Sequence, residues 1–85
     1  MTAVGPHVLS RILREHGAAL VLYSRQWCRT PEDVVQEAFF SLARQVECPD
    51  NVLAWLYRVV RNGAISAAQA ASRRAWLTDL LNERS

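Results

Sequence analysis

Apolar residues recur along this chain at alternating spacings of four and three, which is the period of an amphipathic α-helix. The first stripe predicts a helix over about residues 7–27. It consists of Leu9, Leu13, His16, Leu20, Tyr23 and Trp27. Charged residues such as Arg11, Arg14 and Arg25 fall on the opposite side. This helix should therefore pack through one face and present the other to water.

A second helix is predicted to begin just after Thr30. The Thr30 side chain can cap a helix, and Pro31 suits the first helical position. Glu32 and Asp33 follow, where carboxylates interact favourably with the positive end of the helix dipole. The buried stripe of this helix should consist of Val35, Ala38, Phe39, Leu42 and Val46.

A third helical pattern starts after a loop at residues 48–51, with Asp50 or Asn51 as the cap. Its four-three rhythm continues from Leu56 to Leu81 without a proline. We expect a break near residues 72–74, because one rod of that length could not stay packed against two helices. The last apolar residues would then form a short C-terminal helix folded back onto the core. The alternative is a docking helix for a partner or for a second copy of the chain.

The predicted fold class is all-α: a compact bundle of three main helices plus a short C-terminal helix, in one domain spanning residues 1–85. Length and composition agree, since 85 residues with 51% hydrophobic content can bury one modest core. Neither an internal repeat nor a linker interrupts the helical pattern.

Charge and cysteine content say more about where the protein is found than about what it does. The formal net charge is only +2, from ten arginines and eight acidic residues, which is a weak signal for nucleic acid. Cys28 and Cys48 are two lone thiols rather than a disulfide framework. The longest apolar run is far below the ~20 residues that a membrane span needs. With no signal peptide in the sequence, we expect a cytoplasmic protein that does not associate with membranes.

Enzymatic chemistry finds no support in the sequence. The two histidines and two cysteines lack the short spacings of structural zinc ligands. The sequence has no glycine-rich phosphate loop and no nucleophile elbow. Asp33 and Glu37 should lie on one exposed helix face rather than opposite each other across a cleft. We therefore expect no catalytic residues, no metal site and no cofactor.

Two segments in fixed order point to a family. The first is Asp33-Val-Val-Gln-Glu-Ala-Phe39, and the second is Trp55-Leu-Tyr-Arg58 followed by Arg61-Asn62. Together they resemble region 2 of bacterial sigma factors, most closely the extracytoplasmic-function subfamily, over about residues 12–65. This resemblance implies a protein that binds the RNA polymerase core and helps to open the promoter in transcription initiation.

The resemblance assigns polymerase binding to the second helix, which in sigma factors docks on the basic coiled-coil helices of the β′ clamp. Asp33, Gln36 and Glu37 would carry that contact, with Phe40 as an apolar anchor. Their spacings of three and four place them on one face, where two carboxylates and an amide can accept hydrogen bonds from arginines. The alternative interpretation is an ordinary solvated helix flank.

The resemblance assigns DNA contact to the third helix, which in such proteins meets the non-template strand of the promoter minus-ten element. The candidates are Trp55, Tyr57, Arg58, Arg61 and Asn62. Arginines would follow the phosphates, and the aromatic rings would stack on flipped bases. The two aromatic residues could instead be core, and we expect Trp55 to be packed rather than stacked on a base.

The chain departs from the family after Asn62. Where sigma factors of this subfamily usually carry an aspartate and several basic residues, residues 64–72 have no charge at all. Fewer cations mean weaker DNA binding, so polymerase contact is better supported than promoter reading. Nothing after Asn62 resembles the minus-thirty-five-reading domain either. The alternative function is a sigma-like interaction module that pairs with an anti-sigma protein or with itself.

Overall fold

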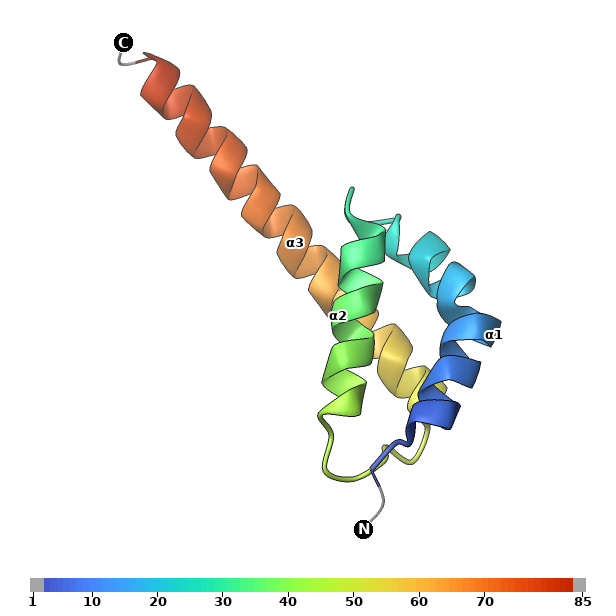
Figure 1. Cartoon of the computed structure of the whole chain (residues 1–85). Helices are drawn as coiled ribbons and strands as arrows, with labels where there is room; N and C mark the ends of the chain where they lie inside the picture. The colour runs from blue at the N-terminus through green and yellow to red at the C-terminus, as the bar shows by residue number, and fades with distance from the viewer. Residues whose placement is uncertain (1–2, 84–85) are drawn as a thin grey trace.

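The computed structural model describes residues 3–83 and consists of three helices: α1 (Pro6–Ser24), α2 (Pro31–Ala43) and α3 (Val52–Glu83). In Figure 1, α1 and α2 run antiparallel, and the first part of α3 packs beside them. The rest of α3 projects away from the other two helices. The described residues contain no strand, so the predicted all-α class is confirmed.

The starts of α2 and α3 follow local sequence signals. Pro31 takes the first helical position of α2, and Glu32 and Asp33 lie in the first turn, as predicted. Thr30 precedes the helix, but its side chain makes no capping hydrogen bond. At α3 the backbone N–H of Ala54 donates to Oδ1 of Asn51 over 3.0 Å, so Asn51 is the cap.

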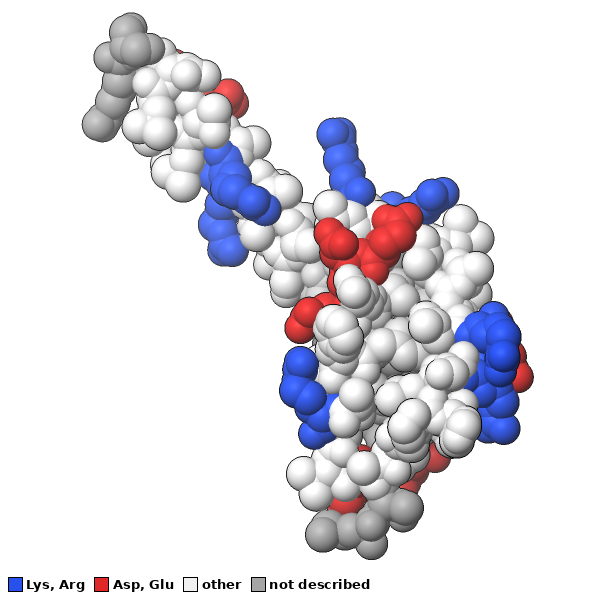
Figure 2. All heavy atoms as spheres, viewed as in Figure 1, with Lys and Arg blue, Asp and Glu red and all other residues white. Residues whose placement is uncertain are grey.

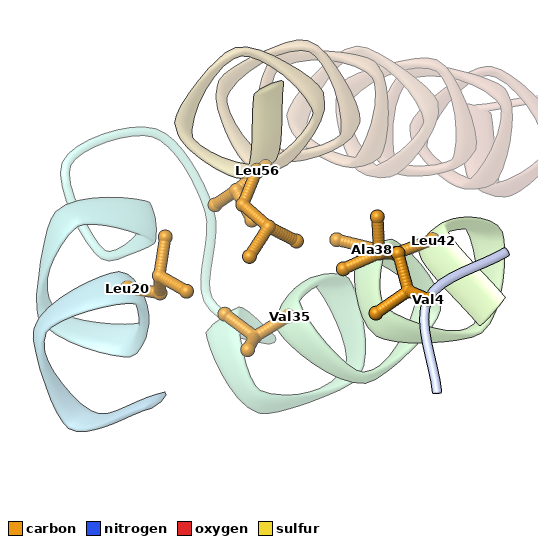
Figure 3. Packing of buried hydrophobic residues seen from close by; sticks show 7 residues of the cluster. Val4, Leu20, Val35, Ala38, Leu42 and Leu56 are labelled. Carbon is orange, nitrogen blue, oxygen red and sulfur yellow. The ribbon is translucent and has the colours of Figure 1, made fainter. Parts of the chain in front are cut away.

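One apolar core joins the three helices (Figure 3). Leu20 from α1, Leu42 from α2 and Leu56 from α3 are fully buried in it. The other buried members of this core cluster are Val4, Val35, Ala38 and Val60. Val46, predicted as part of the buried stripe, is 71% exposed, because α2 ends at Ala43 and the chain turns away.

The third helix contradicts two expectations. It continues unbroken through residues 72–74, so the short separate C-terminal helix is absent from the described chain. Its end does not fold back: Trp76 is 63% and Leu81 67% exposed. The molecule is elongated, 56 × 24 × 17 Å, rather than compact. The physical reason is that α1 and α2, with 19 and 13 residues, flank only the first part of this 32-residue helix, and no proline ends it.

Candidate functional site

The outer side of α2 carries the first group of candidate residues. Asp33, Gln36, Glu37 and Phe40 are all exposed, and we call this surface the acidic face. It lies on the side of α2 opposite the buried Ala38, because positions three and four apart share one side of a helix. Figure 2 shows acidic side chains gathered over the outer side of α2. The structure thus brings these four residues together as the sequence predicted.

Glu37 is already engaged in a weak ion pair. Its Oε1 lies 3.6 Å from a guanidinium nitrogen of Arg44, which follows directly after the last residue of α2. The two side chains are 70% and 64% exposed, so water screens the interaction strongly. The Glu37 carboxylate can therefore exchange this arginine for a cation on a partner at little cost.

Grooves border the acidic face on both sides. Between α1 and α2, a groove of about 490 Å³ is lined by Leu13 and Val21 of α1 and by Asp33 and Phe40 of α2, among others. On the other side, between α2 and α3, a second groove is lined by Asp33, Glu37 and Gly63. Asp33 therefore lies on the rim of both grooves, and a partner on the acidic face could also reach apolar surface.

A glycine that lines the second groove, Gly63, allows α2 and α3 to approach each other closely. A Cβ atom placed on Gly63 would lie 3.3 Å from Cγ1 of Val34, a contact tighter than most Cβ atoms make. Ala64, the next residue, is fully buried. The uncharged stretch that follows Asn62 therefore begins as a packing surface against α2, which agrees with its small side chains.

The five candidates on α3 do not share one narrow face. Arg58, Arg61 and Asn62 are exposed, whereas Trp55 and Tyr57 are half-buried against the core. The two aromatic residues lie about 160° apart around the helix axis, since each residue turns an α-helix by roughly 100°. They therefore mark the two edges of the exposed surface, and the prediction that Trp55 packs is confirmed. Trp55 also borders an open hollow formed by residues 44–50.

An aromatic chain connects α3 to the end of α1. The rings of Tyr57 and Tyr23 meet edge to face with centroids 4.8 Å apart, and Tyr23 meets Trp27 in the same way at 4.9 Å. The guanidinium carbon of Arg61 lies 5.9 Å from the Trp27 ring centroid. Trp27 thus adjoins the candidate residues of α3, although the sequence predicted only a packing role for it. Its partner on α3 could not be found from spacing, because 34 positions separate the two residues.

The described residues show neither a metal-binding cluster nor a membrane-spanning helix. Between residues 3 and 83, no three His, Cys, Asp or Glu side chains come together as a metal ion would require. His16, on the predicted apolar stripe, lies partly exposed beside Glu15, with 3.9 Å between the two side chains. No helix over these residues is both long and apolar enough to cross a lipid bilayer.

Most of the chain is similar to one family of known proteins. The model of the family Sigma-70 region 2 matches residues 12–77. This match extends beyond Asn62, over the uncharged residues 64–72 and as far as Leu77. No curated protein and no solved structure matches the chain.

Proposed function

Because the chain belongs to the Sigma-70 region 2 family, a non-enzymatic part of the sigma factors that act in transcription initiation, we propose that it binds the RNA polymerase core. The contact is made by the acidic face, Asp33, Gln36, Glu37 and Phe40, on the coiled-coil helices of the β′ clamp. We further propose that α3 contacts the melted minus-ten strand of the promoter. Both contacts are made in the cytoplasm.

One observation carries the polymerase contact: all four residues of the acidic face are exposed on one side of α2, away from the core. Carboxylates on such a rigid helix can accept charge-assisted hydrogen bonds from arginines without reorganising the fold. Phe40, half exposed beside them, supplies an apolar anchor of the kind that dominates binding energy at interfaces. Fully buried carboxylates or a buried Phe40 would have argued against this function.

The DNA contact is supported by the exposed residues Arg58, Arg61 and Asn62 of α3. Two arginines three positions apart can reach neighbouring phosphates, and Asn62 offers both a donor and an acceptor to a base edge. Trp55 and Tyr57 are partly buried, so only the exposed part of each ring is available to a base.

The polymerase contact is tested by titrating the fluorescently labelled chain against core RNA polymerase and against the isolated β′ clamp helices. Glu37→Arg should weaken binding by at least roughly tenfold, because it replaces an attractive charge by a repulsive one. The matched control is Arg44→Ala, which removes the same intramolecular ion pair but keeps the Glu37 carboxylate. It should bind at least as well as the wild type. Equal losses in both variants, or none in Glu37→Arg, would contradict the proposal.

A second candidate function is a protein-interaction module that pairs with an anti-sigma protein or with itself and does not bind DNA. The observation that favours it is the exposed apolar surface near the end of α3, including Trp76 and Leu81. Binding of a single-stranded minus-ten oligonucleotide at low salt would separate the two functions, because only the first requires it. Membership of the extracytoplasmic-function subfamily, and a single domain spanning residues 1–85, stay predictions.

A further inference from the structure

The far half of α3 carries an apolar surface that its own bundle does not cover. We call Arg73, Arg74, Trp76, Leu77 and Leu81 the tail surface. The exposed fractions of the last three are 63%, 49% and 67%, and none of the five belongs to the core cluster. Around the helix axis the two leucines and the two arginines lie within about 100°, and Trp76 lies about 60° outside them, at the edge of the surface. Exposed apolar side chains gathered in this way are of the kind that marks a protein interface.

A complementary surface lies elsewhere on the same molecule, in the groove between α1 and α2. One end of this groove is apolar, with Leu13 and Phe40 exposed by 52% and 50%. The other end is acidic, because Glu32 and Asp33 line it at the start of α2. A ligand for this groove must be apolar at one end and basic at the other.

The tail surface has this order of charges and apolar groups at the right spacing. From Asp33 to Phe40 the groove extends seven residues along α2, and from Arg74 to Leu81 the tail surface extends seven residues along α3. Both distances are about 10 Å at 1.5 Å per helical residue. A tail helix parallel to α2 therefore sets its arginines beside the two carboxylates and its leucines beside the apolar end.

The tail surface cannot reach the groove of its own chain. The helix is continuous from Val52 to Glu83 and carries the tail surface away from α1 and α2 (Figure 1). Reaching back would require a break in a segment without proline, which would disrupt several backbone hydrogen bonds. The occupant of the groove must therefore come from another molecule.

We propose that this occupant is a second copy of the chain, and that two copies exchange their tail surfaces reciprocally. In this two-fold dimer the tail of each protomer lies in the α1–α2 groove of its partner, so the same contact is made twice. The dimer itself does not depend on the proposed function. It does cover Asp33 and Phe40 of the acidic face, so a chain that binds polymerase does so as a monomer.

A charge exchange tests this arrangement by sedimentation velocity over a concentration series, with no polymerase present. The groove variant is Glu32→Arg with Asp33→Arg, and the tail variant is Arg73→Glu with Arg74→Glu. Each variant alone opposes like charges in both contacts, so its dimer dissociation constant should rise at least roughly tenfold. An equimolar mixture pairs opposite charges in both contacts of each mixed dimer, so the mixture should dimerise clearly more tightly than either variant alone.

Matched controls separate the contact from net charge. Arg11→Glu with Arg14→Glu changes the net charge as much as the tail variant, and Glu47→Arg with Asp50→Arg as much as the groove variant. Both controls lie outside the two surfaces and should dimerise as the wild type does. Leu81→Glu should abolish dimerisation while leaving the helical circular dichroism of the bundle intact, because Leu81 is 67% exposed in the single chain.

A variant that carries all four substitutions completes the test. It reverses the charges of the groove and of the tail together, so opposite charges face each other again in both contacts of its dimer. Its dissociation constant should return to within about threefold of the wild type.

Three outcomes would overturn the proposal. The first is a wild-type chain that stays monomeric up to millimolar concentration. The second is a dimer that survives in the groove variant, because that result assigns the contact to pairing between two α3 helices. The third is a fourfold variant that fails to dimerise although it is folded by circular dichroism.

Discussion

The guanidinium group of Arg61 on α3 lies over the indole ring of Trp27, with its central carbon 5.9 Å from the ring centroid. Trp27 follows the end of α1, where its backbone N–H donates to the carbonyl of Ser24 over 3.1 Å. The turn after Ser24 therefore directs the indole toward α3, and Tyr23 supports the ring from the side. One arginine of the proposed DNA surface is thus held by a residue from another part of the chain.

Removal of the indole should weaken DNA binding by way of Arg61. Trp27→Leu frees the guanidinium from an interaction typically worth about 0.5–1 kcal/mol, so affinity for a single-stranded minus-ten oligonucleotide should fall roughly two- to fivefold. Fluorescence anisotropy measures this change. Trp27→Phe keeps an aromatic face and should recover part of the affinity. In a double-mutant cycle the effect of Trp27→Leu should disappear once Arg61 is alanine, and additive effects would contradict the coupling.

The salt dependence of the same binding reports how many phosphates the protein neutralises. For single strands the slope of log K against log salt changes by about 0.7 for each phosphate, so Arg58→Ala and Arg61→Ala should each flatten the slope by about that amount. Arg11→Ala, on the exposed side of α1, should leave the slope unchanged. Unchanged slopes in both α3 variants would remove the DNA contact from the proposed function.

A leucine-to-alanine substitution should destabilise the protein strongly near the start of α3 and hardly at all near its end. Leu56 is fully buried, so Leu56→Ala should lower the free energy of unfolding by about 2–5 kcal/mol, which is enough to unfold much of a domain this small. Leu81 is 67% exposed, and Leu81→Ala should change stability by less than about 0.5 kcal/mol. Urea titration followed by circular dichroism, at a concentration where the chain is monomeric, compares them. Similar destabilisation in both variants would mean that the far end of α3 packs on the core.

The start of α3 depends on one side-chain hydrogen bond. Asn51→Ala removes the acceptor for the N–H of Ala54 and should lower the free energy of unfolding by about 1 kcal/mol. Asn51→Asp keeps an oxygen acceptor at the positive end of the helix and should retain wild-type stability. Thermal unfolding of both variants measures the difference. Greater destabilisation in the aspartate variant than in the alanine variant would exclude the capping role.

Much of this protein could be predicted from local sequence alone. The three helical regions, Pro31 at the first position of α2, and the shared exposed face of Asp33 and Glu37 all follow from the helical period and from end signals. These features depend on residues at most four positions apart, which interact within one helix in any fold. For the same reason the family resemblance, carried by residues on two helices, could be seen before any tertiary contact was known.

Tertiary structure alone decided which part of α3 is buried and which part is exposed. The pattern of apolar residues is similar before and after residue 72, yet Leu56 is buried and Leu81 is exposed. The difference arises because α1 and α2 are too short to flank the whole of α3, and burial requires a neighbour in space rather than a period in sequence. The contact between Arg61 and Trp27 has the same origin. Neither residue's local pattern contains the other, and only the packing of α1 against α3 brings them together.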